Sequence, residues 1–197
     1  MKWKTAGQWL AVLTGGIVIV VIVYVIMKQK HKTEVEEAST DANVKAFLKM
    51  LQWAEGTNGD YHIVFGGAHF QNMSDHPAIT GEWTGKILSD DICIAAGQNP
   101  GCKSTAAGAY QIIKPTWLGL KSKLDLKDFT PVSQDLAAIE LIREKGALDD
   151  VKAGRVQEAI DKVRFVWASL PGNTYRQPTK TLADLKNYYE TKGGNIA

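Results

Sequence analysis

Glu55 is the acidic residue whose position in the sequence is hardest to explain as ordinary surface charge. It continues an apolar helix face with the spacing i, i+3, i+4, i+7, formed by Val44, Phe47, Leu48 and Leu51. Gly56 follows at once and predicts that the helix ends there, with Glu55 at the edge of a loop. A carboxyl group half buried beside Leu51 and Trp53 loses hydration in its charged form, so its pKa rises toward neutral. This is the profile of a glycosidase general acid; the alternative is an exposed glutamate whose stem covers apolar neighbours.

Other reactive residue types form weaker patterns. The run Ser74-Asp75-His76-Pro77 contains the residue types of a catalytic triad. Adjacency in sequence does not build a triad, and Asp-x-Pro is a common turn, so we interpret the run as a turn. His62, His69 and His76 show no metal-ligand periodicity, and we expect no metal site.

The elements that must position Glu55 are mostly helices. Proline marks two helix starts, after Lys114 and after Thr130, and apolar stripes mark two more helices, over residues 156–167 and 182–189. The inward positions are Trp117, Leu118, Leu124, Leu136, Ile139, Ile142, Val156, Ile160, Val163, Trp167, Leu182 and Leu185. Residues 61–65 are β-prone and end in Gly66-Gly67, which predicts a hairpin or an extended flap beside a cleft. The expected fold class is α+β, mostly α, with Trp117 and Trp167 in the core rather than against a sugar.

Composition and the N-terminus divide the chain into parts. With 197 residues, 45% apolar content and a net charge of +2, it forms one globular domain plus an extra segment, and nucleic acid is not an expected partner. Residues 9–27 carry no charge and are long enough as a helix to cross a hydrocarbon core about 30 Å thick. We therefore predict a tail over 1–8, a transmembrane helix over 9–27, a polar tether over 28–41 and a domain over 42–197. A cleaved signal peptide is the competing interpretation, but its apolar region is usually shorter.

Several separate blocks, in the same order and over roughly residues 43–194, resemble the endolysin family of bacteriophage lambda. They include Phe47-Leu48-x-Met50-Leu51-x-Trp53-Ala54-Glu55-Gly56-Thr57, Phe65-Gly66-Gly67-x-x-Phe70, Lys103-Ser104-Thr105-Ala106-Ala107-Gly108-Ala109-Tyr110-Gln111, and Trp167-Ala168-Ser169-Leu170-Pro171-Gly172-x-x-Tyr175. The resemblance implies a lysozyme-like fold. It also implies a lytic transglycosylase, which cuts peptidoglycan between N-acetylmuramic acid and N-acetylglucosamine and closes a 1,6-anhydro ring.

The same resemblance implies which residues bind the substrate. Tyr110 and Gln111 match the family's Tyr-Gln pair at the cleft, where the amide would hold an N-acetyl or hydroxyl group. As plain sequence, they are equally a buried tyrosine and an exposed glutamine. Gly67 and Phe70 belong to another matching block and are expected at the substrate as well.

Three further positions near these blocks bear on the bound sugar. Tyr175 follows a Pro-Gly turn, where an aromatic ring either faces a sugar or packs against the domain. Ala54 and Ala109 depart from the family pattern, which has Ser before the Glu and Arg before Tyr-Gln. These departures affect the expected contacts around the sugar rather than the class of reaction.

The two cysteines, Cys93 and Cys102, lie within residues 80–103. This stretch is longer than the corresponding connection in the lambda endolysin and looks like an insertion. A disulfide would close a small loop there and would persist in an oxidising compartment, whereas two free thiols are the alternative. The spacing is too wide for a Cys-x-x-Cys metal clasp.

The number of carboxylates determines the expected mechanism. A conventional glycosidase uses two, about 5 to 9.5 Å apart. The candidates for the second, Asp60, Asp75 and Asp128, all lie in turn-like contexts. One carboxylate suffices if Glu55 protonates the glycosidic oxygen, the N-acetyl group or C6 hydroxyl stabilises the oxocarbenium-like centre, and Glu55 then deprotonates the C6 hydroxyl. No metal or organic cofactor is implied.

These observations lead to a membrane-anchored phage enzyme that degrades the cell wall locally during genome entry. Its domain would lie outside the cytoplasm, in the host periplasm or the virion. Its expected partners are peptidoglycan glycan strands, the host inner membrane or a virion membrane, and other virion proteins. The strongly apolar N-terminal segment favours this role over a host-lysis endolysin. A non-catalytic glycan-binding virion structural protein is the third hypothesis.

Overall fold

A computed structural model describes residues 6–172 and 179–197, with side chains from residue 19 onward. The chain divides into two compact units, one up to Glu34 and one from Val35 to Ala197. The first unit is part of helix α1 (Ala6–Ala38), whose last turn belongs to the second unit. Val35 and Ala38 are each 1% exposed in the core of that second unit. Much of the region predicted as a polar tether, residues 28–41, is therefore helical.

The predicted transmembrane helix over 9–27 is not supported. Within the described part of the chain, no helix combines the length and the apolar character needed to cross a bilayer.

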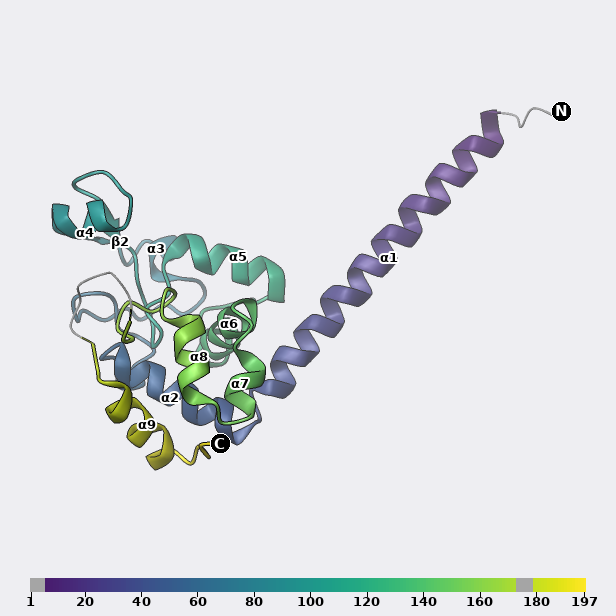
Figure 1. The fold of residues 1–197 in the computed structure, drawn as a ribbon. Coiled ribbons are helices and arrows are strands. Elements are labelled where there is room, and N and C mark those ends of the chain that lie inside the picture. Colours follow the sequence, from purple (N-terminus) through teal and green to yellow (C-terminus); the bar gives the residue numbers. More distant parts are fainter. Residues whose placement is uncertain (1–5, 173–178) are drawn as a thin grey trace. The chain divides into compact units, whose positions relative to one another are not determined.

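The second unit is mostly helical with a small sheet, as the sequence predicts (Figure 1). Its helices are α2 (Ala42–Ala54), α3 (Pro77–Thr80), α4 (Asp90–Ala95), α5 (Lys114–Leu124), α6 (Pro131–Glu144), α7 (Leu148–Lys152), α8 (Val156–Val163) and α9 (Leu182–Thr191). Strands β1 (Lys86–Ile87) and β2 (Lys103–Ser104) pair antiparallel, with Lys86 opposite Ser104. Helix α2 contacts α6, α7 and α9, so the helix that carries Glu55 at its end is held on several sides.

The two ends of α2 are fixed by different interactions. At its start, the Asp41 side chain accepts a hydrogen bond from the Val44 N–H at 3.0 Å, a typical N-cap. At its end, Glu55 is the C-cap and Gly56 adopts φ +75°, which suits a residue without a side chain. Trp53 stacks on Tyr188 of α9 with ring centroids 4.5 Å apart, so the last turn of α2 is also held from outside.

The core forms around α2, α5 and α6. Trp117 is fully buried and packs edge-on against Phe129, with ring centroids 4.7 Å apart. Trp167 is buried as well, so the prediction that both tryptophans belong to the core is confirmed. The prediction that Leu118 points inward is wrong, because its side chain is 47% exposed. Leu120 is buried instead. The buried face of α5 has the spacing i, i+3, i+7, which leaves position 118 outside.

The β structure differs in place from the prediction. Residues 61–65 form no strand; Ile63 and Val64 make single bridges to His69 and Ala107. The turn between Ile63 and His69 is therefore the expected flap, without an extended hairpin. The true two-stranded sheet lies at the base of residues 86–104, a segment that we call the arm.

The arm contains α4 (Figure 1). It also contains the disulfide between Cys93 and Cys102. The predicted pairing is confirmed, and the two Cα atoms are 5.8 Å apart. Asp90 at the start of α4 accepts a hydrogen bond from the Gly101 N–H at 3.1 Å, which closes the same loop a second time. The arm is thus held internally by a covalent and a polar contact.

Gly108, two residues before Tyr110, packs tightly against the side chain of Gln134. Gly108 has φ +76°, and a Cβ added there would lie 2.0 Å from Oε1 of Gln134. That amide bonds the Ala109 N–H, the Tyr61 carbonyl and the Phe129 carbonyl. We expect Gly108→Ala to lower the free energy of unfolding by about 2–4 kcal/mol, measured by urea denaturation, because it displaces a buried amide from its partners.

Gly146→Ala is the matched control. Gly146 also has a positive φ, +66°, but a Cβ there meets nothing within 4 Å. Only backbone strain opposes that substitution, so it should cost about 1 kcal/mol. Equal losses in the two variants would contradict the role given to Gln134.

Candidate active site

Burial and hydrogen bonding have opposite effects on the pKa of Glu55. The Ser169 hydroxyl donates a hydrogen bond to Oε1 of Glu55, and the Ser169 backbone N–H donates to the same carboxylate. Both bonds favour the charged form, but loss of hydration in the protein outweighs them. Burial therefore raises the pKa of Glu55 from 4.5 to about 7, so that the group exchanges a proton near neutral pH.

The Glu55 carboxylate opens into a pocket of about 150 Å³, which we call the acid pocket. Segments distant in sequence meet there: the end of α2, the flap, the base of the arm and the stretch after α8. The lining residues are Glu55, Phe65, Ser104, Ala106, Gln111, Val166, Trp167 and Ala168. Glu55 is the one ionisable side chain among them, so no second carboxylate faces this space in the described part of the chain.

A larger hollow of about 430 Å³ adjoins the acid pocket, and we call it the side hollow. Gln111, Val166 and Trp167 line both spaces. The side hollow continues toward α5 and α6, along residues that include Ile113, Thr116, Glu144, Lys145 and Phe165. A ligand held at Glu55 can therefore extend past Gln111.

Gln111 reaches the acid pocket, as predicted. Its backbone has φ +49°, a conformation that is uncommon for a residue with a side chain. The side-chain Nε2 donates a hydrogen bond to the Gly108 carbonyl at 3.0 Å. That bond restrains the amide at the pocket wall.

Tyr110 is only 1% exposed and does not line the acid pocket, although it contributes to the wall of the side hollow, so its predicted contact with substrate stays a prediction. Its hydroxyl donates to Oδ1 of Asp135 at 2.6 Å and accepts from Nε2 of Gln52 at 2.8 Å. Tyr61 donates to the same Asp135 oxygen at 2.8 Å. Burial raises the pKa of the Tyr110 hydroxyl well above its usual value, so it stays a hydrogen-bond donor. These contacts tie α2 to α6 and fix the backbone from which Gln111 projects.

The other predicted substrate contacts lie elsewhere. Phe70 is 2% exposed and packs against Phe129 with ring centroids 5.9 Å apart, so its predicted contact with substrate is wrong. Gly67 is exposed at the turn of the flap, with φ +91°, and does not line the acid pocket. Tyr175 lies outside the described residues.

Asp60, the first candidate for a second carboxylate, is hydrogen-bonded to His62 and His69 of the flap region. It accepts hydrogen bonds from the His62 N–H at 2.8 Å and from Nε2 of His69 at 2.6 Å. Burial by itself would raise its pKa, but these two histidines hold the pKa of Asp60 below its usual value. It does not line the acid pocket.

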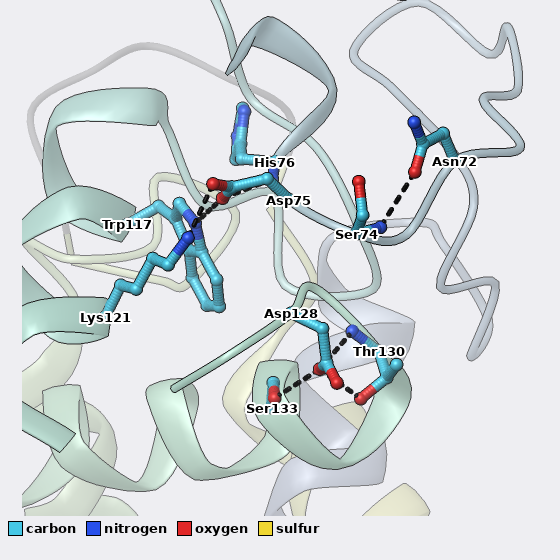
Figure 2. A network of polar contacts seen from close by, with 9 residues as sticks. All are labelled: Asn72, Ser74, Asp75, His76, Trp117, Lys121, Asp128, Thr130 and Ser133. Carbon is cyan, nitrogen blue, oxygen red and sulfur yellow. Dashed lines mark hydrogen bonds and ion pairs between the residues drawn. The ribbon is translucent and has the colours of Figure 1, made fainter. Parts of the chain in front are cut away.

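Asp75 and Asp128 are held by donors in the same way, as Figure 2 shows. Asp75 accepts from Nε1 of Trp117 at 2.7 Å and pairs with Nζ of Lys121 at 2.5 Å. Asp128 accepts from the hydroxyls of Thr130 and Ser133. These donors outweigh burial and keep the pKa of both aspartates low, which suits structural anchors rather than proton carriers.

The run from Ser74 to His76 forms no catalytic triad. The Ser74 N–H donates to Asn72, and its side chain does not point at His76 (Figure 2). His76 is buried, with Nε2 facing the Ile112 carbonyl at 2.9 Å and Nδ1 accepting from the Ala78 N–H. It caps α3, as expected for a turn.

Sequence reasoning missed Phe65, Ser104 and Ser169. All three lie within blocks that resemble the endolysin family, so a signal was present but did not single them out. Ala109, one of the two departures from that pattern, is buried, and its N–H donates to Gln134 at 2.9 Å. Its side chain does not line the acid pocket.

The mostly helical unit with an acid facing the acid pocket is typical of a lysozyme-like protein. The Endolysin family model matches residues 45–196, and the chain belongs to that family. The endolysin of Escherichia phage P2 is 40% identical over 168 residues, covering 79% of this chain and 96% of the relative. The endolysin of Escherichia phage lambda is 38% identical over 160 residues, covering 77% and 92%.

Solved structures agree with this assignment. The bacteriophage lambda lysozyme complexed with a chitohexasaccharide has a TM-score of 0.66 and 35% identity, and the match covers 80% of this chain and 97% of that one. A second lambda lysozyme structure matches at a TM-score of 0.64 and 34% identity. The chain is accordingly a peptidoglycan-cleaving enzyme of the transglycosylase type.

The comparisons also correct the predicted localisation. The relatives are endolysins, and the family model begins at residue 45, after α1 has ended. Together with the lack of a spanning helix in the described residues, this overturns the prediction of a single-pass membrane protein. That prediction rested on the apolar character and the length of residues 9–27.

The raised pKa of Glu55 makes stability depend on pH. The folded chain binds a proton more tightly at Glu55 than the unfolded chain does, so stability falls as pH rises from 4.5 to about 7 and then levels off. We expect Glu55→Gln to remove this dependence. The unfolding free energy of Glu55→Gln minus that of wild type should be more positive at pH 8 than at pH 4.5. The change between the two pH values should be at most about 3 kcal/mol. Urea denaturation at both pH values measures the difference, and a difference that does not change with pH would contradict the raised pKa.

Proposed function

We propose that this chain is a host-lysis endolysin that cleaves the bond between N-acetylmuramic acid and N-acetylglucosamine with Glu55 as its single general acid and base. The observation that carries the proposal is the acid pocket, where a carboxyl group with a pKa of about 7 faces the open space. Asp60, Asp75 and Asp128 do not line the acid pocket, are engaged by donors and have lowered pKa values. A mechanism with one carboxylate follows from this division.

The first step requires the protonated form of Glu55. The acid gives its proton to the glycosidic oxygen while the bond from that oxygen to C1 of the muramic acid breaks. The N-acetyl group or the C6 oxygen of the same sugar stabilises the positive charge that develops at C1. Glu55 is then a carboxylate, which the two hydrogen bonds from Ser169 stabilise.

The second step returns the proton. The C6 hydroxyl attacks C1, and Glu55 takes the hydroxyl proton as the bond from O6 to C1 forms. The products are a free hydroxyl on the glucosamine fragment and a 1,6-anhydro ring on the muramic fragment, so no water is consumed. The intramolecular hydroxyl has a high effective concentration and wins over water, for which no second base faces the pocket.

Two neighbours of Glu55 have supporting roles in this proposal. Ser169 is a positioning residue, because its hydroxyl orients the carboxylate toward the pocket. Gln111 is proposed to hold an N-acetyl or hydroxyl group of the sugar, since its restrained amide lies at the pocket wall. Gly67 is proposed to contribute only through the flap, whose neighbour Phe65 lines the pocket.

The biological role follows from the relatives rather than from the N-terminal segment. Both curated relatives are endolysins, which supports wall degradation at the end of infection. The role in genome entry depended on a membrane anchor and loses its support with it. A non-catalytic glycan-binding role would give no reason for a desolvated acid at the pocket.

The first test removes the acid. Glu55→Gln keeps the shape and the acceptor for the Ser169 hydroxyl but cannot donate a proton, so release of soluble fragments from purified sacculi should fall about 10²- to 10⁴-fold. Circular dichroism and thermal unfolding verify the fold. Asp60→Asn is the matched control at a nearby carboxylate and should keep most of the activity. A comparable loss in Asp60→Asn would show that two carboxylates act in the reaction.

The second test identifies the product. Mass spectrometry of fragments from sacculi digested by the full chain should show muramic ends that lack one water relative to reducing ends. A hydrated, reducing muramic end as the main product would mean that water, activated by another base, attacks C1. The reaction would then be hydrolysis even though the same bond is cleaved.

A further inference from the structure

The side hollow extends the acid pocket into a space large enough for a second part of the substrate. Its volume of about 430 Å³ falls within the roughly 300–1,000 Å³ typical of ligand sites, whereas the acid pocket has only about 150 Å³. Gln111, Val166 and Trp167 belong to both spaces. A group attached to the sugar at Glu55 can therefore reach the side hollow along these shared walls.

One wall of the side hollow is apolar and open to solvent. Ile113 is 42% exposed and Phe165 is 53% exposed, and Val166 lies beside them. The Arg164 guanidinium lies 5.0 Å from the centroid of the Phe165 ring and pairs with Asp161 at 2.9 Å, so it covers the back of that ring without adding net charge. Such a surface suits short aliphatic side chains better than polyhydroxylated sugar edges.

The opposite rim is charged. Glu144 pairs with Lys123 at 2.7 Å, so its charge is already compensated. Lys145 follows it as the exposed C-cap of α6, where a helix favours a cation, and it has no ion-pair partner among the described residues. The rim therefore presents an ammonium group to whatever enters the hollow.

The chemistry of peptidoglycan distinguishes two occupants. Its sugar rings carry hydroxyl and acetamido groups, which need hydrogen-bond partners but no cation. The peptide attached to the lactyl group of the muramic acid carries free carboxylates and small apolar side chains. We propose that the side hollow binds this peptide stem, with Lys145 pairing with a stem carboxylate and with Ile113 and Phe165 contacting its apolar side chains.

This inference rests on the proposed function, because it places the muramic acid at Glu55. The stem leaves that sugar at the lactyl group on C3, so it can point away from the bond that breaks. Binding there makes the enzyme selective for peptide-bearing strands without changing the reaction at C1. Lys145 is thus a specificity-determining residue.

The experiment compares two forms of the same polymer. The full chain is given intact glycan strands, and strands from which an N-acetylmuramoyl-alanine amidase has removed the peptides, and kcat/KM is measured on each. Wild type should prefer the intact strands. Lys145→Gln should reduce the ratio of the two kcat/KM values about fivefold, mainly through KM on intact strands, as expected for one exposed charge pair.

Lys152→Gln is the matched control. Lys152 is likewise an exposed lysine in the last turn of a helix, α7, but it does not line the side hollow. The ratio of kcat/KM on intact strands to kcat/KM on stripped strands should be the same for Lys152→Gln as for wild type. Equal wild-type activity on the two substrates would overturn the inference. An equal loss on both in Lys145→Gln would overturn it as well, because it would place a sugar or the lactyl group, which is a free carboxylate in the stripped strands, at Lys145 instead of the peptide. If neither substrate yields anhydro ends, the proposed function itself fails.

Discussion

The desolvation of one carboxyl group at the end of α2 is the constraint on which this structure depends. A carboxylate at a helix C-terminus already faces the unfavourable end of the helix dipole. Removal of water raises the pKa further, and only the two bonds from Ser169 oppose it. The balance leaves the pKa of Glu55 at about 7, where the acid and its conjugate base are both populated at neutral pH. A group that must give and then take a proton needs this condition, which stronger donors or full hydration would abolish.

The surrounding packing keeps that balance fixed in space. Gln52, one turn before Glu55, bonds the hydroxyls of both Tyr61 and Tyr110, and these hydroxyls converge on Asp135 of α6. A buried polar network of this kind is costly to leave partly satisfied, so its members hold one arrangement. Glu55 and Gln111 are attached to the two sides of this network. Their relative placement at the pocket therefore follows from side chains that do not themselves line the acid pocket.

The sequence was most informative where local rules and tertiary packing agree. The apolar face of α2 and the glycine after it correctly placed Glu55 at a helix end, and the proximity of Cys93 and Cys102 correctly suggested their bond. The prediction for Leu118 was wrong because the buried face of α5 is narrower than the sequence pattern suggested. The prediction for Phe70 was wrong because a shared motif does not say whether a ring points into the core or toward the substrate. Ser169 could not be singled out, because it lies 114 residues from Glu55 and only the closed fold brings the two together. The N-terminal prediction rested on the length and apolar character of residues 9–27, and the described residues contain no helix that could cross a membrane.

The treatment of the other carboxylates explains why one acid can differ so much from the rest. Asp75 and Asp128 are as much a part of the folded unit as Glu55, yet each receives donors that more than replace its lost water. Their charged forms stabilise the fold, whereas the charged form of Glu55 destabilises it. The protein can tolerate this local cost because the disfavoured group lies at the edge of a core that α2, α6, α7 and α9 complete without it. Conflict between local stability and global fold is expected at functional sites, and Glu55 is such a position.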